Sequence, residues 1–264
     1  YTSPLRGTFG GVSFLKEDYA LLKAFIEAIV DFLKLKEASI IQLSLPPLCF
    51  EPSKTALLFH TLSELDFHPV KSELSYAFKV SDLPLETQMK RNNQKRLRKC
   101  RRANMQFFQE NDKATCAKIF EVIEKNRASK GYFLSMNFEQ IWQMQETFPQ
   151  QVLFFGVSHD QQLISGSVCI KVSEDYLYVF YWGDLPGYEK FSPVVYLAEG
   201  IYQFGQRNQY QVIDVGTAML GNELNEKLAA FKLNLGCEAS LKFTVQKRIK
   251  KYNPNSHGYE RTAD

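Results

Sequence analysis

The sequence VIDVGT at residues 212–217 decides the fold of this chain, together with FKLNLG at residues 231–236. The first stretch has the apolar character of a short buried strand, and it ends in a polar turn. Gly216 allows a backbone conformation that other residues resist, and Asp214 supplies a carboxylate beside it. The second stretch predicts a helix that carries Lys232 and ends at a glycine. A strand end that gathers an acid, a flexible backbone and a cation suits an anionic ligand or a developing negative charge.

The elements predicted around these two stretches alternate in a regular order. Three strands joined by short polar turns predict an antiparallel meander, and helices and strands then alternate to the end. The expected elements are strands at 152–157, 163–172 and 176–182, helix 193–207, strand 210–215, helix 223–234 and strand 239–246.

The first half of the chain predicts a helix–strand alternation followed by a basic helix. Apolar spacing, capping residues and prolines mark the boundaries. We expect helix 15–36, strand 38–45, helix 53–65 capped by Ser53, strand 76–80, a basic helix opened by Leu83–Pro84, strand 105–108, and helices 113–129 and 137–147, the last begun by Asn137 with Gln140 three residues on.

Asp-x-Gly, followed by a helix that carries Phe-Lys and a closing glycine, resembles the Fem-type acyltransferases of the GNAT superfamily. The resemblance covers about residues 85–246 and is strongest over 176–246. It implies an α/β fold with a central mixed sheet flanked by helices, in two tandem GNAT-like units. We therefore expect an incomplete first unit at 1–104, an acyltransferase unit at 105–250 and a polar tail at 251–264. The short first unit agrees with missing N-terminal elements, and the chain begins without methionine, but the sequence leaves open whether earlier residues are missing.

The resemblance implies that the chain joins an activated acyl or aminoacyl group to an amine acceptor. The matching lysine of these enzymes has an oxyanion-stabilising role, which the resemblance carries to Lys232. Asp214, Tyr181 and Asp184 are further catalytic candidates. Either Tyr181 or Asp184 would orient or deprotonate the amine, and the sequence leaves that choice open.

The loop that leads into the predicted helix 193–207 is a candidate donor site. The start of a helix has free backbone N–H groups that suit an anion. Acetyl-CoA-dependent GNAT enzymes carry Arg/Gln-x-x-Gly-x-Gly/Ala here, whereas this loop contains Gly187 alone. The difference favours an aminoacyl-tRNA donor, with acyl-CoA as the alternative. The predicted donor-binding residues of this region are Lys190, Ser192, Gly216 and Asn222.

The predicted basic helix is a second candidate for binding phosphates. Eight basic residues and no acid lie between Lys90 and Arg102, and the rest of the chain has 24 basic against 29 acidic residues. Four of the cations share one helix face, namely Arg91, Lys95, Arg98 and Arg102. This face favours the phosphates of a nucleotide, a tRNA or CoA. The alternatives are a solvated surface, or a catalytically silent protein that binds tRNA or another polyanion.

Other features exclude several classes of function. The five cysteines are scattered, which favours a reduced, cytoplasmic protein. The four histidines show no metal-ligand spacing, so we expect no metal site. No apolar run has the length of a membrane span. Motifs for P-loop chemistry, dinucleotide binding and serine hydrolysis do not occur.

Overall fold

The computed structural model describes residues 1–5 and 7–249, and the predicted polar tail at 251–264 lies outside these residues. The chain divides into two compact units, 1–73 together with the residues from 241 on, and 74–240. The strands β3 (His68–Lys79) and β11 (Glu238–Arg248) have residues in both. The compact units therefore differ from the predicted division after residue 104, because the last strand returns to the first unit. The presence of two GNAT-like units stays a prediction.

The first unit is a small mixed sheet with two helices. Its strands lie in the order β1 (Thr2–Ser3), β2 (Ile40–Ser44) and β11, with β1 parallel and β11 antiparallel to β2. The helices α1 (Tyr19–Leu35) and α2 (Pro52–Glu64) pack on each other. Ser53 does not cap α2 as predicted. Its hydroxyl instead donates to Glu17, and Pro52 begins the helix.

The second unit contains the predicted meander. The strand order is β3, β8, β7, β6, β5, β4, and all neighbours are antiparallel except β7 and β8. The bounds are β4 (Gln106–Glu110), β5 (Val152–His159), β6 (Gln162–Lys171), β7 (Tyr176–Asp184) and β8 (Val212–Thr217).

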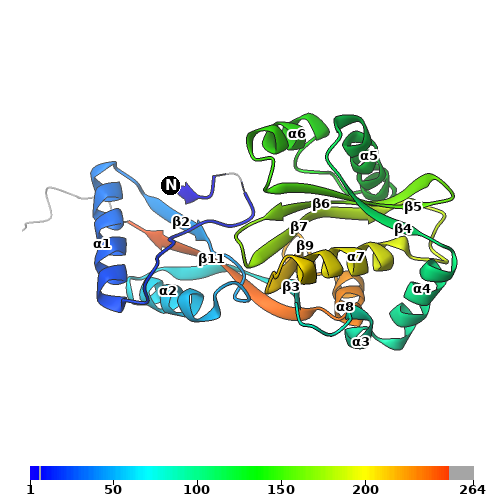
Figure 1. Ribbon diagram of the computed structural model, residues 1–264. Helices are drawn as coiled ribbons and strands as arrows, with labels where there is room; N and C mark the ends of the chain where they lie inside the picture. The colour runs from blue at the N-terminus through cyan, green and yellow to red at the C-terminus, as the bar shows by residue number, and fades with distance from the viewer. Residues whose placement is uncertain (6, 250–264) are drawn as a thin grey trace, which may run out of the picture. The chain divides into compact units, whose positions relative to one another are not determined.

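Helices cover both faces of the strands of this unit (Figure 1). On one face α5 (Lys113–Ser129) and α6 (Phe138–Thr147) enclose an apolar cluster with Phe120 and Phe154 at its centre. On the other face α7 (Pro193–Arg207) packs over the larger cluster. The fold class predicted from the sequence, a central mixed sheet flanked by helices, is confirmed.

Capping residues and prolines predicted the ends of some helices correctly and the ends of others incorrectly. Asn137 and Gln140 form the predicted capping box of α6, with both hydrogen bonds at 3.0 Å. The predicted basic helix is two helices, α3 (Leu85–Gln88) and α4 (Arg91–Arg102). The predicted helix 223–234 begins later, as α8 (Glu226–Asn234), because a hairpin of β9 (Met219–Leu220) and β10 (Glu223–Leu224) precedes it.

Gly200 permits the close approach of α7 to the sheet. A Cβ at this position would lie 2.1 Å from Cδ2 of Phe107. We therefore expect Gly200→Ala to destabilise the protein by about 1–3 kcal/mol, although alanine favours helices. Urea unfolding of Gly200→Ala and of the double variant Gly200→Ala/Phe107→Leu measures the effect. The double variant should recover part of the loss, and equal losses in both would contradict the packing argument.

Candidate functional site

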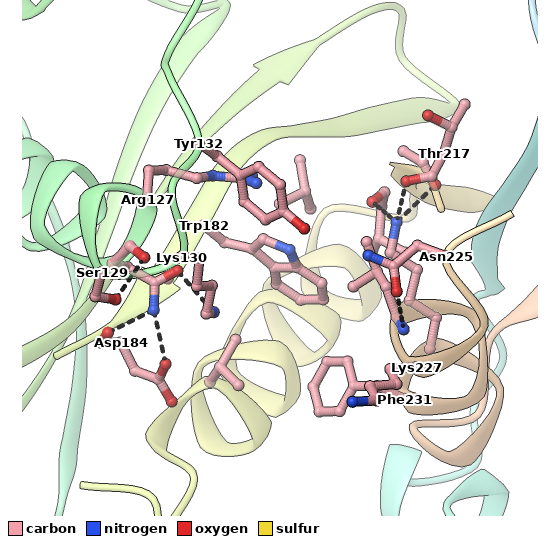
Figure 2. A pocket seen from close by; sticks show the side chains of 18 of the residues that line it. Arg127, Ser129, Lys130, Tyr132, Trp182, Asp184, Thr217, Asn225, Lys227 and Phe231 are labelled. Carbon is pink, nitrogen blue, oxygen red and sulfur yellow. Dashed lines mark hydrogen bonds between the residues drawn. The ribbon is translucent and has the colours of Figure 1, made fainter. Parts of the chain in front are cut away.

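A cleft opens in the second unit where β7 and β8 separate. The two strands pair in parallel at three positions, the last of which joins Tyr178 to Asp214. Beyond this pair both strands continue, and their residues line a cleft of about 850 Å³ (Figure 2). The residues of these two strands in its wall are Tyr178, Val179, Phe180, Trp182, Gly183 and Asp184 of β7 and Val215, Gly216 and Thr217 of β8.

Lys232 of α8 holds the end of β8 in place. Its ammonium group donates hydrogen bonds to the carbonyl oxygens of Val215 and Gly216, both at 2.8 Å, and of Thr217 at 2.9 Å. Successive carbonyls of a regular strand point in opposite directions, so three in a row reach one ammonium only because the chain bends at Gly216, where φ is +76°. An ammonium group has three donors. These three hydrogen bonds therefore use all of them, and Lys232 has no N–H left for a ligand.

The carboxylate of Asp214 stabilises the same bend at Gly216 through a side-chain hydrogen bond. Its side chain is 1% exposed, and one carboxylate oxygen accepts hydrogen bonds from the backbone N–H of Gly216 at 2.8 Å and the hydroxyl of Ser75 at 3.0 Å. Asp214 does not line the cleft. The structure brings the predicted residues Asp214, Gly216 and Lys232 together, with contacts that support the backbone of the strand end. A catalytic role for Asp214 stays a prediction.

Burial also affects the charge of Lys232. The side chain is 2% exposed, and desolvation lowers its pKa to about 8. The carboxylate of Asp214 opposes this shift, and the nearby guanidinium of Arg127 adds to it. The group therefore remains mostly protonated at neutral pH, and the cleft contains a second cation close enough to influence it.

That second cation is Arg127, from the last turn of α5. Its guanidinium forms no hydrogen bond or ion pair with any residue in 1–5 and 7–249, and its Nε is buried. Burial lowers the pKa of Arg127 below the ordinary arginine value, and the tyrosines 132, 178 and 181 oppose that shift. Figure 2 shows its side chain in the wall of the cleft beside Tyr132. A partly buried guanidinium whose Nε has no protein acceptor is suited to pair with an anionic group.

Asp184 stands at the end of β7 and is tied to α5 and α7. Asn126 donates from Nδ2 to its carboxylate at 3.1 Å and to its backbone carbonyl at 2.6 Å, and Lys130 donates to Asn126 Oδ1 at 3.0 Å. Burial raises the pKa of Asp184, while the Lys130 charge and a hydrogen bond from the Val194 N–H oppose the increase. A carboxyl group with a raised pKa in a cleft wall is a candidate general base.

The start of α7 has few donors left for a ligand. Val194 N–H bonds to Asp184, Ser192 N–H to the Tyr188 carbonyl at 3.0 Å, and Val195 N–H to the Ser192 carbonyl at 2.9 Å. Pro193 has no N–H. The amides that would hold a CoA pyrophosphate are thus used within the chain, and this helix start does not fit that group. Ser192 lines the cleft, and its role in donor binding stays a prediction.

The other predicted site residues lie outside the cleft lining. The Tyr181 hydroxyl is held by Ser135 Oγ at 2.5 Å and Met136 N at 3.2 Å, in the apolar cluster under α5. Lys190 is exposed beside Phe191, and Asn222 is exposed in the β9–β10 hairpin. The basic stripe predicted on α4 is also exposed and does not line the cleft, and one of its members is neutralised, since Arg98 pairs with Glu86 at 2.7 Å.

Sequence reasoning missed several residues of the cleft. Arg127 lies on an amphipathic helix with five other charged residues, so nothing in its spacing separates it from a surface arginine. Arg96 lines the cleft although it falls outside the predicted i, i+4 stripe of α4. Aromatic side chains supply much of the remaining wall, and one usable signal was their alternation along β7. These aromatic residues are Tyr132, Tyr178, Phe180, Trp182 and Phe231.

Two further searches of the described residues gave negative results. Among residues 1–5 and 7–249 no three His, Cys, Asp or Glu side chains gather in a way that could hold a metal ion. Within the same ranges no helix has both the length and the apolar character needed to cross a bilayer.

Comparison with solved structures identifies the fold. No family model matches the sequence, and no curated protein matches it. FemX superposes with a TM-score of 0.74 over 90% of this chain and 79% of its own, at 11% identity. L-PGS from Bacillus licheniformis gives a TM-score of 0.57 at 13% identity, over 84% of this chain and 72% of its own. A conserved protein of unknown function from Bacteroides thetaiotaomicron gives 0.59 at 12% identity, over 85% and 75%.

The chain therefore has the GNAT-like fold of the Fem-type acyltransferases, as the resemblance implied. Because the sequence identities are only 11–13%, the similarity to these structures is evidence for a shared fold alone.

The first prediction from the site concerns the three hydrogen bonds of Lys232. Lys232→Met keeps the length of the side chain but leaves three carbonyl groups without their donor. We expect it to lower the free energy of unfolding by about 2–5 kcal/mol. Lys227→Met is the matched control, because Lys227 is exposed on the same helix and also lines the cleft. It should change stability by less than about 0.5 kcal/mol. Equal stabilities of the two variants would contradict the assigned hydrogen bonds.

The pKa of Lys232 gives a dependence of stability on pH. The folded protein releases this proton near pH 8, and the unfolded chain near 10.5. Between these values the unfolded state binds more protons, so stability rises with pH. We therefore expect the unfolding free energy of the wild type, relative to Lys232→Met, to increase from about pH 8 to about pH 10.5. Denaturant titrations across this range measure it, and a difference that falls with pH would contradict the lowered pKa.

Proposed function

We propose that this chain is an N-acyltransferase that moves an activated acyl or aminoacyl group from its donor to an amine. The observation that supports it is the cleft between β7 and β8, which combines a partly buried guanidinium that has no partner among the described residues with a carboxyl group of raised pKa. The first suits an anionic substrate group, and the second suits removal of a proton from an attacking amine. The Fem-like fold is consistent with this chemistry.

In the proposed reaction the amine nitrogen attacks the carbonyl carbon of an acyl ester, and Asp184 takes the proton that the nitrogen loses. The tetrahedral intermediate then expels the donor oxygen, which takes up the proton from Asp184 as the amide forms. Arg127 holds an anionic group of a substrate and so fixes the position of the reacting atoms. Lys232 acts through its charge and through the shape of the strand end, since its three donors are already used.

The contacts at the start of α7 support one class of donor over the other. Because Asp184, Tyr188 and Ser192 accept the amide hydrogen bonds there, the contacts weigh against acyl-CoA and favour an ester donor such as aminoacyl-tRNA. The exposed cations of α4 that lack a carboxylate partner among the described residues would suit the phosphates of such a donor. They would equally suit a silent tRNA-binding protein, so turnover is the decisive observation.

The test of the proposed function measures amine-dependent turnover. A mixed tRNA pool charged with labelled amino acids is incubated with protein and a set of primary amines, and labelled amides are detected by mass spectrometry. We expect Asp184→Asn to reduce the rate by about 10²–10⁴-fold. In the wild type the rate should fall with decreasing pH at a value above that of an ordinary carboxyl, because burial raises the pKa of Asp184.

Glu189→Gln is the matched control for this assay. Glu189 also lines the cleft, but it is exposed, and its carboxylate accepts the Gly187 N–H of its own loop at 2.8 Å. It should keep the wild-type rate within about twofold, a change of less than about 0.5 kcal/mol. Wild-type activity in Asp184→Asn would exclude the assigned base. A tRNA affinity without any amide product would favour the silent binder.

CoA provides a separate prediction. A ligand at a hundred times its Kd adds about 2.7 kcal/mol to stability, or about 2–4 °C for a chain of this size. We expect acetyl-CoA and free CoA to give no saturable shift of the melting temperature up to millimolar concentration. Saturable stabilisation would contradict the reading of the α7 start and would favour an acyl-CoA donor.

A further inference from the structure

We propose that Arg96 forms a phosphate-binding subsite at the α4 edge of the cleft, separate from the anion contact at Arg127. This inference rests on the proposed function only in assuming that the ligand is a substrate. Arg96 lines the cleft, whereas the four cations of the predicted α4 stripe do not. It is therefore the α4 arginine placed to meet a ligand in the cleft.

Arg96 is not neutralised by the protein. Its guanidinium donates to Asn93 Oδ1 at 3.2 Å and forms no ion pair with any carboxylate in residues 1–5 and 7–249. Two other arginines of the same helix do have such partners. Arg98 pairs with Glu86 at 2.7 Å, and Arg101 pairs with Glu86 at 2.6 Å and with Glu199. The helix thus pairs the arginines that hold it to its neighbours and leaves the one at the cleft available.

Asn93 accepts a hydrogen bond from the Arg96 guanidinium and so holds its orientation. Asn93 is 2% exposed, and its Nδ2 finds no hydrogen-bond partner among the described residues. A buried amide N–H without an acceptor destabilises a fold. The orientation is nevertheless the one that offers Oδ1 to Arg96. The contact therefore directs the guanidinium at the expense of stability, as ligand-binding sites do.

The local charge favours a phosphate over a single carboxylate. No residue of α4 is acidic, and Lys227 of α8 adds a cation to the cleft wall. Lys99 is fixed close by, with its ammonium on the Lys190 carbonyl at 3.0 Å and above the Phe191 ring at 5.0 Å. Two carboxylates line the same cleft and already accept hydrogen bonds from the protein: Glu189 from the Gly187 N–H, and Asp184 from Asn126. A guanidinium among other cations suits the doubly charged, bidentate phosphate group.

The first experiment measures binding of inorganic pyrophosphate to the full chain by isothermal titration calorimetry at constant ionic strength. We expect Arg96→Gln to weaken binding by about tenfold or more. Lys95→Gln is the matched control. It also removes one positive charge, but from the residue that precedes Arg96, which is exposed and does not line the cleft. It should weaken binding by less than about twofold.

A second variant separates the effect of the orientation of the Arg96 guanidinium on binding from the effect of its charge. Asn93→Leu retains the Arg96 charge but removes the acceptor that directs it, so we expect an intermediate loss of about three- to tenfold. Circular dichroism melting confirms that each variant is folded before binding is measured. Equal affinities of Arg96→Gln and Lys95→Gln would overturn the subsite, and so would acetate binding as tightly as phosphate.

Two further titrations identify the source of the phosphate. Adenosine 5′-monophosphate represents the terminal nucleotide of an aminoacyl-tRNA donor, and sn-glycerol 3-phosphate represents a glycerophosphate-type acceptor. Tighter binding of either one than of inorganic phosphate, lost in Arg96→Gln, supports the subsite and assigns its substrate. Loss of the subsite with retained amide formation would leave the proposed acyl transfer intact. The converse result would exclude acyl transfer and keep the subsite.

Discussion

The ammonium group of Lys232 holds three successive carbonyl oxygens at the end of β8, and the cleft depends on this contact. A strand that leaves its neighbour in a sheet exposes backbone acceptors, and buried acceptors need donors. Strand β8 leaves β7 after Asp214, and the lysine supplies the donors that the ladder no longer provides. Gly216 makes the bend, and the Asp214 carboxylate fixes it from the other side. Asp214, Gly216 and Lys232 therefore act together to keep the ends of β7 and β8 apart.

This use of Lys232 determines where ligand charge can be bound. A lysine with three carbonyl partners cannot also donate to a substrate, and the first amides of α7 are already bonded within the chain. Arg127 and Arg96, which come from different helices, are the guanidinium groups in the cleft lining that we propose for the negative charge of a substrate. Aromatic side chains of the same cleft, Trp182 and Tyr132 among others, reduce the access of water and strengthen such charge interactions (Figure 2).

The fold could be predicted from the sequence because its signals are local. Alternation in the meander, the capping box at Asn137 and the proline at the start of α7 each depend on neighbouring residues. The pairing of VIDVGT with the lysine of FKLNLG was also predictable, through the resemblance that the two stretches carry. The direction of the lysine was not, because nothing in the spacing shows that three backbone carbonyls will converge on it. Arg127 and Arg96 were missed for a related reason, since their significance lies in the partners that they lack.

The most direct test of this account is a crystal structure of Lys232→Met. If the ammonium group keeps the strands apart, residues 215–217 will lose their bend in the variant and form backbone hydrogen bonds with the end of β7, which narrows the cleft. If the cleft instead keeps its width, with the three carbonyls still converging on one point, then the bend at Gly216 and the Asp214 carboxylate suffice, and the central role given to Lys232 is wrong.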